Sequence, residues 1–336
     1  MVKKNESLNY ISLFSGAGGL DLGFENVGFK NLFSVEFNES FCKTYTKNFP
    51  SNIILNIDIS KLSSDKIKSF IQNKRVHLII GGPPCQGFSL AGNIARKFVD
   101  DPRNKLFKEF VRIVNHVKPD VFLMENVASL KTHNSGKTLK KIIKCFASAG
   151  YDVKSKILNA VNYGVPQNRR RIFIVGFKKH NQFVFPKHSK KIITVKDAIN
   201  DLSSCLPKNN NISNHVPMKH SIQMLEKMKF VKDGGNRNDI PKKLRPKSGD
   251  CRKYIRYDSK KPSVCVTGDM RKIFHYKLNR ALTTRELARL QTFPDNFIFL
   301  GTQGQIQQQI GNAVPVKLAQ SVAKCIWNEL VTKTNE

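Results

Sequence analysis

The sequence predicts an α/β protein with a large domain built on a parallel sheet and a smaller, irregular second domain. Over the first 180 residues, short apolar runs alternate with stretches of helical periodicity. Runs that are apolar almost throughout are typical of parallel strands covered by helices on both faces. The alternation stops between about 180 and 280, where Lys, Asn, Pro and Gly are frequent and positive charge concentrates. We therefore expect a sheet-based domain interrupted by a small, irregular second domain, with a disordered insert as the alternative.

The charge of the chain indicates an anionic partner. Lys and Arg number 57 against 25 Asp and Glu, which gives a formal net charge of +32. From Lys178 to Arg280 there are 25 basic and 8 acidic residues, so more than half of the excess lies in under a third of the chain. Nucleic acid is the usual partner of such a segment, and a lysine-rich surface without a partner is the alternative. No apolar run approaches the ~20 residues that cross a bilayer, so we expect a soluble, intracellular protein.

The elements of the large domain follow from their periodicity. Apolar runs predict strands, and the stretches between them predict helices, for example over 104–117 and 136–149. In a parallel sheet, ligands bind at the carboxyl ends of the strands, so chemistry is expected there. The predicted strands are 8–14, 31–37, 53–59, 76–81, 120–125 and 171–177.

Fewer elements are predicted after residue 180. Residues 254–268 (YIRYDSKKPSVCVTG) look like two short strands around a turn. Thr283, with an acid three residues later, predicts a capped helix over 283–292. A last helix is expected over about 314–331, where Trp327 packs in the core.

A glycine-rich turn and two acids follow the first three predicted strands. The turn FSGAGGLDLGF allows the backbone to approach a ligand closely before a helix begins. Glu36 ends the second strand and suits a ribose with free hydroxyls, while Asp58 ends the third and suits an amino group such as that of adenine. Either acid alone is more often a cap or a surface residue, but the three together favour a cofactor site. The expected contacts in the turn are Phe14, Ser15, Gly16, Ala17, Gly18, Gly19 and Leu20.

Among the seven cysteines, Cys85 is the one whose neighbouring residues indicate a functional role. The odd number and the lack of zinc-type spacing favour a reducing compartment and mostly buried thiols. Cys85 stands in GGPPCQGFS after the fourth predicted strand, where two prolines stiffen the turn and present the side chain. An exposed, stabilised thiolate is a nucleophile, whereas a buried thiol in a rigid loop is inert. The local sequence leaves both interpretations open.

The fifth and sixth predicted strands carry further polar residues. Glu125 ends the fifth strand, next to the end of the strand that leads to Cys85. A carboxyl group buried in such a crevice has a raised pKa and can donate a proton at neutral pH, whereas a solvated glutamate at a strand end is the alternative. Gln167, Arg169 and Arg171 precede or begin the strand 171–177. They form a solvated loop or, if they lie at the same edge, contact phosphate and the carbonyl oxygen of a base.

Taken in order, these segments resemble the cytosine-5 DNA methyltransferases, in particular the bacterial restriction-modification type. The resemblance covers about 1–178 and 279–330, and six ordered motifs make it very specific. The motifs are FSGAGGLDLGF, GGPPCQGFS, ENV, QNRRR, RALTTRELARLQTFPD and QQIGNAVP.

The resemblance implies the domain organisation and the cofactor. It implies a Rossmann-like domain dependent on S-adenosylmethionine, formed by 1–180 together with 305–336. It further implies that 181–280 is a target-recognition domain that reads DNA in the major groove, and that 281–304 is a hinge or structural helix segment. S-adenosylhomocysteine is the expected product, and no metal is expected.

Residue roles follow from the same resemblance. Glu36 would hold the ribose of S-adenosylmethionine, and Asp58 with Ile59 its adenine. Where Ala313 stands, the family often has serine, so a hydroxyl contact is absent here. Further cofactor contacts are expected from Pro83, Asn312 and Ala313.

The implied reaction begins when the Cys85 thiolate adds to carbon 6 of cytosine and so activates carbon 5. Glu125 would bind nitrogen 3 and the exocyclic amine, and Arg171, assisted by Arg169, would hold the carbonyl oxygen at carbon 2. The methyl group then moves to carbon 5, and loss of a proton releases the enzyme. The cytosine must first leave the duplex.

DNA contacts are expected from a loop and from the basic region. Residues 87–104 would form a mobile lid, with an ordinary surface loop as the alternative. Two departures from the family pattern are Asn104, where glycine is common, and Cys265-Val266, where threonine usually comes first. The expected DNA contacts are Ser89, Arg96, Lys97, Gln167 and Arg271.

Other functions remain possible at this level. A tRNA cytosine methyltransferase would share the fold, a catalytically silent DNA-binding regulator would share the charge, and a nicotinamide-dependent oxidoreductase would need a different glycine spacing. We expect double-stranded DNA as partner, a monomer, and a location in the bacterial cytoplasm at the nucleoid. A cognate restriction endonuclease is expected as a functional partner rather than a bound one.

Overall fold

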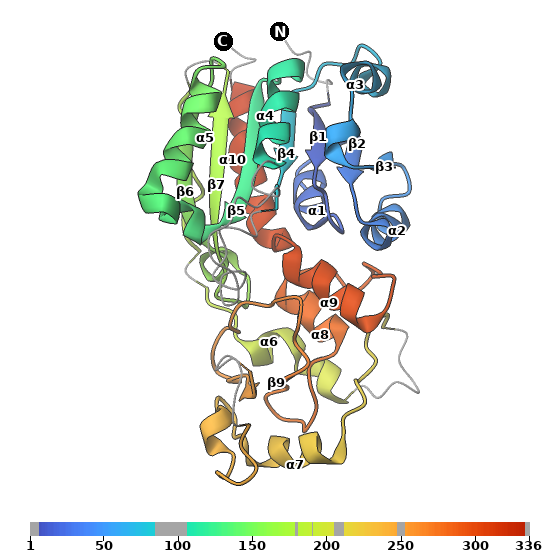
Figure 1. The fold of residues 1–336 in the computed structure, drawn as a ribbon, viewed down its shortest axis with the longest axis vertical. Coiled ribbons are helices and arrows are strands. Elements are labelled where there is room, and N and C mark those ends of the chain that lie inside the picture. The colour runs from blue at the N-terminus through green and yellow to red at the C-terminus, as the bar shows by residue number, and fades with distance from the viewer. Residues whose placement is uncertain are drawn as a thin grey trace. The chain divides into compact units, whose positions relative to one another are not determined.

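The computed structural model describes residues 7–84, 106–178, 181–189, 191–204, 212–246 and 253–332 (Figure 1). Their contacts form two compact units. The first, here called the sheet unit, comprises residues 1–159, 170–187 and 319–336, and the second unit comprises 160–169 and 188–318. By these contacts, 305–318 lies in the second unit, although the sequence analysis grouped it with the sheet. The functional names given to the predicted domains stay predictions.

The sheet unit is built on seven strands in the order β3-β2-β1-β4-β5-β7-β6. From β1 to β5 all neighbours pair in parallel, as predicted, but β7 is antiparallel to both β5 and β6. The sheet is therefore mostly, not wholly, parallel. The strands are β1 (Asn9–Leu13), β2 (Lys30–Glu36), β3 (Ile54–Asn56), β4 (Leu78–Gly81), β5 (Val121–Val127), β6 (Asp152–Asn159) and β7 (Arg170–Phe177).

Strand β6 was missed by the sequence analysis because it is an edge strand. Lys154 and Lys156 interrupt its apolar pattern, and most of its side chains are at least partly exposed. Charged residues, lysine above all, are common on edge strands because they discourage pairing with another chain. A search for continuous apolar runs therefore passes over such a strand.

Helices cover the sheet on both faces. The aliphatic and aromatic faces of α3, α4 and α5 pack with the strands in one core cluster that includes Ile67, Phe110 and Phe146. The final helix α10, predicted over 314–331, runs over Val316–Thr332 and lies on the other side of the sheet from α4 (Figure 1). Trp327 packs edge-on against Phe29, with ring centroids 5.0 Å apart, so its predicted packing role is confirmed. The other helices of this unit are α1 (Gly19–Glu25), α2 (Glu39–Asn48), α3 (Ser64–Ile71), α4 (Leu106–Val117) and α5 (Lys137–Ala147).

The second unit has little regular structure. Among its described residues, a two-stranded sheet pairs β8 (Ile255–Arg256) with β9 (Ile273–Phe274) in parallel. The prediction of two strands around a turn within 254–268 was therefore wrong: the partner of Ile255–Arg256 lies outside that segment, and Ser263 forms only an isolated bridge with Gln167. Helices are α6 (Val195–Ile199), α7 (Ile222–Phe230), α8 (Thr284–Leu290) and α9 (Gln303–Asn312).

Helix α8 begins as predicted. Thr283 Oγ1 accepts a hydrogen bond from the Glu286 amide at 3.2 Å, and Glu286 Oε2 accepts one from the Thr283 amide at 2.8 Å. Such a capping box satisfies two of the free amides at a helix start. Arg280 binds the buried Glu286 carboxylate through two nitrogens at 2.6 and 2.7 Å. These contacts hold the start of α8 in place.

Buried arginines hold the irregular part of the second unit together. A segment with few strands leaves main-chain carbonyls without ladder partners, and buried carbonyls need donors. The guanidinium of Arg256 supplies five such hydrogen bonds, and that of Arg285 binds the carbonyls of Ser213, Pro294 and Phe297. The acceptors of Arg256 are the carbonyls of Met228, Val231, His275 and Leu278 and the side chain of Asn279, all at 2.6–2.7 Å.

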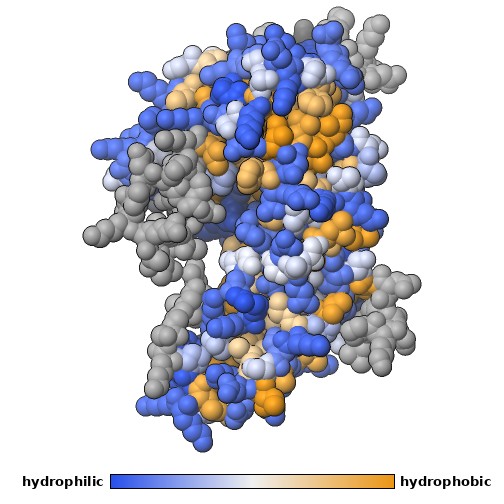
Figure 2. All heavy atoms as spheres, turned by 45° about the vertical axis from the view of Figure 1, so that its right-hand side comes forward, coloured by the Kyte–Doolittle hydropathy of each residue, from blue (hydrophilic) through white to orange (hydrophobic). Residues whose placement is uncertain are grey.

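Figure 2 shows that the surface on one face of the molecule is largely hydrophilic, with hydrophobic residues in small groups. Within the described part of the chain, no helix is both long and apolar enough to traverse a lipid bilayer.

Replacing Arg256 tests the arginine scaffold. Arg256→Met keeps a long apolar stem but leaves four main-chain carbonyls without their donor. Each buried group left unpaired costs about 1–3 kcal/mol, so we expect the free energy of unfolding to fall by about 4 kcal/mol or more. Urea unfolding with limited proteolysis of residues 212–280 measures the loss. The control Arg271→Met, at an exposed position, should change stability by less than about 0.5 kcal/mol; equal losses in both variants would contradict the scaffold role.

Candidate functional site

The glycine turn and Glu36 meet at the carboxyl end of the sheet. Phe14, Gly16 and Gly18 all have positive φ angles, of 56°, 58° and 92°. The Gly16 amide donates to Glu36 Oε2 at 2.9 Å, and the Asn38 amide donates to Glu36 Oε1 at 2.8 Å. Burial raises the pKa of Glu36, and these main-chain hydrogen bonds oppose that shift. The predicted juxtaposition of the turn with an acid at the end of the next strand is present.

Gly18 is required at its position for two reasons. Its φ of 92° is unfavourable for other residues. A Cβ atom there would lie 2.4 Å from a ring carbon of Phe49, so the main chain of the turn packs directly against the residue that ends α2. The turn is therefore fixed by contact with α2 as well as by its own hydrogen bonds.

Asp58 and Ile59, the predicted adenine contacts, follow the end of β3 and are engaged in local structure. Asp58 Oδ1 caps a short 3-10 helix (η1, Ile59–Lys61) by accepting hydrogen bonds from the Ser60 amide at 2.9 Å and the Ser60 hydroxyl at 2.7 Å. These bonds lower the pKa of Asp58, which remains only partly buried. The side chain of Ile59 packs in the core. Asp58 thus has a local capping role, and a ligand would have to bind through its second oxygen.

Phe37 is a site candidate that the sequence analysis missed. Its ring is 73% exposed directly after Glu36, although large aromatic side chains usually bury most of their surface. Asn56 of β3 donates to the carbonyls of Phe37 at 2.8 Å and of Glu36 at 3.1 Å, which fixes the main chain at this strand end. The sequence feature that could have identified it is an aromatic residue directly after Glu36.

Glu125 and Arg171 form an ion pair at the ends of two neighbouring strands. Arg171 Nε lies 3.0 Å from Glu125 Oε1, and both side chains are largely buried. Arg171 stands opposite Val127 in the antiparallel register of β5 and β7. Because β7 runs against β5, its first residues lie at the edge where β5 ends. A Cβ atom on Gly82 would be 3.0 Å from Glu125 Oε2, so the carboxylate also lies against the main chain that follows β4.

Asn126 connects the ends of β4 and β5. Its Nδ2 donates to the carbonyl of Pro83 at 3.1 Å, and its Oδ1 accepts from the Val127 amide at 2.8 Å. Both Asn126 and Pro83 are buried. The chain is thereby held two residues before the predicted nucleophile. Cys85 itself lies outside the described residues, as do Ser89, Arg96 and Lys97.

Arg169 and Gln167 belong to the second unit and are buried there. Arg169 is 1% exposed, and its guanidinium donates to the carbonyls of Val266 at 2.8 Å and Gly311 at 2.7 Å. Gln167 is 0% exposed, accepts from the Val266 amide at 2.9 Å and donates to the carbonyl of Leu290 at 3.2 Å. Both side chains therefore fix the segment around Val266.

The remaining predicted contacts lie at the surface of the second unit. Asn312 ends α9 with an exposed side chain, and Ala313 follows as its C-cap. Arg271 is 70% exposed and pairs with Asp269 at 2.9 Å. Their predicted contacts with cofactor and DNA stay predictions.

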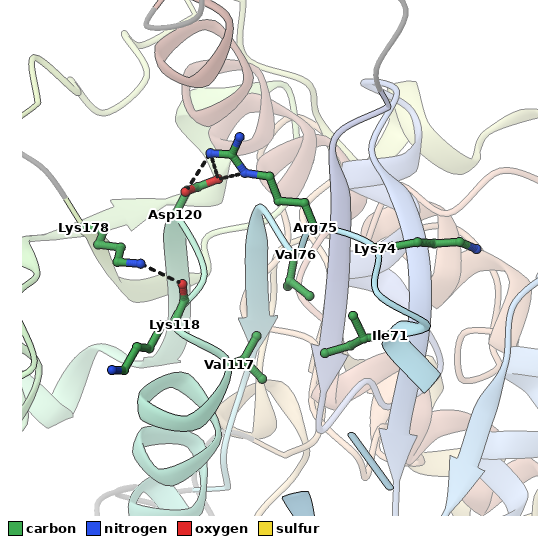
Figure 3. A pocket seen from close by; sticks show the side chains of 8 residues that line it. All are labelled: Ile71, Lys74, Arg75, Val76, Val117, Lys118, Asp120 and Lys178. Carbon is green, nitrogen blue, oxygen red and sulfur yellow. Dashed lines mark hydrogen bonds and ion pairs between the residues drawn. The ribbon is translucent and has the colours of Figure 1, made fainter. Parts of the chain in front are cut away.

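A surface pocket of about 430 Å³ lies at the opposite edge of the sheet from the turn (Figure 3). Val76 and Asp120 precede β4 and β5, and Lys178 follows β7, so the pocket is at the amino ends of the parallel strands. Arg75 binds Asp120 through two nitrogens at 3.1 Å, and Lys178 donates to the carbonyl of Lys118 at 3.4 Å. The pocket is thus separate from the site predicted at the carboxyl ends.

The profile of the family described as C-5 cytosine-specific DNA methylase matches residues 8–328. The chain belongs to this family. The predicted family, the mostly parallel α/β fold and the activity as a DNA cytosine-5 methyltransferase are thereby confirmed. An oxidoreductase is excluded. As a DNA methylase, the protein acts on DNA.

Individual relatives of this methylase cover nearly the whole chain. It is 57% identical over 332 residues to the type II methyltransferase M1.HphI of Haemophilus parahaemolyticus, covering 98% of this chain and 88% of the relative. It is 36% identical to the type II methyltransferase M.FnuDI of Fusobacterium nucleatum, covering 97% and 96%. A crystal structure described as a DNA modification methyltransferase encoded within an Escherichia coli prophage matches with a TM-score of 0.79 and 29% identity, covering 97% and 100%. The methylase is of the type II restriction-modification class.

The residues at the carboxyl ends suit S-adenosylmethionine, the methyl donor on which this family depends. An acid held by main-chain amides offers free lone pairs to ribose hydroxyls, and an exposed ring offers a face for adenine. Among the described residues of this methylase, no group of three or more His, Cys, Asp or Glu side chains is arranged to hold a metal ion.

Gly18→Ala tests how the turn is held. The added methyl group would meet the Phe49 ring and would impose an unfavourable φ, so we expect a loss of about 1–3 kcal/mol in the free energy of unfolding. The matched control is Gly150→Ala, which has a similar φ of 86° but open space around its Cβ position. Urea unfolding compares the two. A loss at Gly18 no larger than at Gly150 would mean that Phe49 does not constrain the turn.

Proposed function

We propose that the protein transfers a methyl group from S-adenosylmethionine to carbon 5 of a flipped cytosine in duplex DNA, with Cys85 as the nucleophile. The observation that carries the proposal is the Glu125–Arg171 pair, held at 3.0 Å against the main chain at Gly82. The chain runs from Gly82 through the anchored Pro83 to Cys85. The acid and the base-carbonyl donor thus lie beside main chain that precedes the proposed nucleophile by three residues in the sequence.

The cofactor contacts are proposed as follows. The main chain of the 14–20 turn would enclose the methionine part, Glu36 would accept hydrogen bonds from the ribose hydroxyls, and Asp58 would accept from the adenine amine. Phe37 would stack on the adenine ring, which its exposure supports. When bound, S-adenosylmethionine supplies an activated methyl group. Additional proposed contacts are Ile59, Pro83, Asn312 and Ala313.

The reaction proceeds by addition and elimination. The electron pair of the Cys85 thiolate forms a bond to carbon 6, and the electrons of the carbon 5–carbon 6 double bond become available at carbon 5. Carbon 5 attacks the methyl group, and the bond to the sulfonium breaks to leave S-adenosylhomocysteine. Water then takes the carbon-5 proton, the double bond re-forms, and the sulfur–carbon bond breaks to release the thiolate.

Glu125 and Arg171 stabilise the charge that this addition creates. Glu125 would bind nitrogen 3 and the exocyclic amine of the cytosine. The Arg171 guanidinium, whose Nε pairs with Glu125, would donate from Nη2 to the carbonyl oxygen at carbon 2. Preorganised donors of this kind typically supply the largest part of such stabilisation. We assign Arg169 to the scaffold of the second unit instead, because its guanidinium already binds two main-chain carbonyls.

DNA contacts are proposed for the basic second unit and for the segment 87–104. Ser89, Arg96, Lys97 and the exposed Arg271 would contact the duplex, whereas the buried Gln167 would act by fixing the segment around Val266. Because the relatives are type II methyltransferases, we infer that the protein protects DNA from a cognate restriction endonuclease, acting as a monomer in the bacterial cytoplasm.

Trapping on 5-fluorocytosine tests the covalent mechanism. Fluorine at carbon 5 cannot leave as a proton does, so wild-type protein should form a stable adduct with duplex DNA in the presence of S-adenosylmethionine. Cys85→Ser should form none and lose roughly 10³-fold or more in methyl transfer, and Glu125→Gln should form the adduct slowly. Denaturing gel electrophoresis detects the adduct. Cys145→Ser, in α5, is the matched cysteine control and should behave as wild type.

Two outcomes would contradict this proposal. An adduct that survives Cys85→Ser would assign the nucleophile elsewhere. Methyl transfer from labelled cofactor to tRNA but not to duplex DNA would overturn the duplex as substrate.

Phe37→Ala tests the adenine contact. Loss of a stacking face worth about 1 kcal/mol should raise the Kd of S-adenosylhomocysteine roughly fivefold to tenfold, as measured by isothermal titration calorimetry. Val184→Ala removes a comparably exposed apolar side chain from another segment and should leave the Kd unchanged. An unchanged Kd in Phe37→Ala would show that the ring does not contact the cofactor.

A further inference from the structure

Directly after the glycine turn, the sheet unit buries a carboxyl group without a neighbouring cation. Asp21 lies in the first turn of α1 and is 0% exposed. Its Oδ1 accepts hydrogen bonds from the hydroxyls of Tyr10 at 3.3 Å and Tyr45 at 3.1 Å. Its Oδ2 is buried without a hydrogen bond of ordinary geometry among the described residues, although the buried hydroxyl of Ser12 interacts with the carboxyl group. A bare carboxylate in such a place is strongly disfavoured.

A second carboxyl group makes this environment still less favourable for charge. Glu25, one turn further along α1, accepts hydrogen bonds from the same Tyr10 hydroxyl at 3.2 Å and from Asn52 at 2.6 Å. The titratable groups that face Asp21 are therefore Tyr10 of β1, Glu25 of α1 and Tyr45 of α2, and none of them is a cation. Burial, together with a smaller contribution from the charge of Glu25, raises the pKa of Asp21 to about 7.

The same groups support the cofactor turn. Helix α1 begins at Gly19, immediately after the turn, and Asp21 is in its first turn. Tyr45, which donates to Asp21, also packs against the turn: a Cβ atom on Gly18 would lie 3.1 Å from its ring. The Tyr45 hydroxyl is further bound to Ser34 of β2 at 2.7 Å. A change in the charge of Asp21 would thus act on both elements that hold the turn.

We propose that Asp21 carries a proton in the folded protein and that this proton keeps the turn at Gly16–Gly19 in its cofactor-binding geometry. The proton removes the repulsion between Asp21 and Glu25 and lets Oδ2 donate toward Ser12. Loss of the proton places two negative charges, on Asp21 and Glu25, within α1. The affinity of the Gly16–Gly19 turn for its ligand then falls. Asp21 is then a positioning residue, and we rest its role on the proposed binding of S-adenosylmethionine by this turn.

The test compares Asp21→Asn with wild-type full-length protein. Asparagine keeps one acceptor oxygen and supplies a permanent donor where the proposed proton lies. Isothermal titration calorimetry with S-adenosylhomocysteine from pH 6 to pH 9 measures affinity. The wild-type affinity should fall as pH rises, approaching tenfold per pH unit once Asp21 ionises, because one proton is linked to binding. Asp21→Asn should lack this fall. Glu25→Gln, the matched control, should keep the fall but shift it to lower pH.

Thermal unfolding without ligand tests whether Asp21 is protonated in the folded protein. An unfolded Asp titrates near pH 4, so the folded protein holds this proton to a higher pH than the unfolded chain does. Its contribution to stability is complete below about pH 4 and is lost as pH rises to about 7. The Tm of wild type should therefore fall relative to that of Asp21→Asn over this range.

The outcomes separate this role from the proposed function. Wild-type affinity that does not change with pH, or an Asp21→Asn variant that falls as steeply as wild type, would overturn the positioning role alone. Failure of wild type to bind S-adenosylhomocysteine at every pH would overturn the proposed cofactor site itself. Equal dependence of Tm on pH in wild type and Asp21→Asn would show that Asp21 holds no proton, whatever the ligand does.

Discussion

The antiparallel pairing of β7 with β5 is the constraint on which the candidate catalytic edge depends. A parallel β7 would begin at the amino edge of the sheet, where its second residue, Arg171, would lie about three residues, or about 10 Å along the strand direction, from Glu125. With β7 reversed, Val127 pairs with Arg171, and the two side chains meet across adjacent strands. The pair then packs against Gly82, where a larger residue would press on the carboxylate. One reversal of chain direction thus assembles residues from three strand ends.

The two units satisfy their main chains in different ways, and this decides what their arginines do. In the sheet unit the ladders use up most carbonyls, so Arg171 remains available to pair with a carboxylate. In the second unit, where strands are short, the guanidinium groups of Arg169 and Arg256 donate hydrogen bonds to main-chain carbonyls. Within the QNRRR motif, the boundary between the two units lies between Arg169 and Arg170. Two arginines two positions apart therefore have unrelated roles, although both are polar residues of one motif.

Prediction from sequence succeeded where a pattern has one physical cause. Buried parallel strands are apolar along their length, and this periodicity located five of them, while the capping pattern at Thr283 located a helix start. Periodicity carries no information on strand direction, so the antiparallel β7 was not anticipated. Lysines on an edge strand concealed β6, and a two-residue strand such as β8 is too short to have a period. Burial of polar side chains was the least predictable feature, because it depends on which carbonyls lack partners after folding.

The cofactor turn departs from the usual rules of local stability in several respects at once. Phe14 adopts a positive φ that costs a non-glycine residue energy, Gly18 has no room for a side chain, and Asp21 is buried beside a second carboxyl group. Sequences tend to keep such violations where function requires them, since elsewhere substitution would remove them. The Gly16 amide, two residues after the left-handed Phe14, donates to Glu36. The strain, the tight packing and the buried acid therefore act on the same few residues, and the surrounding core of the sheet unit supplies the stability that lets them persist.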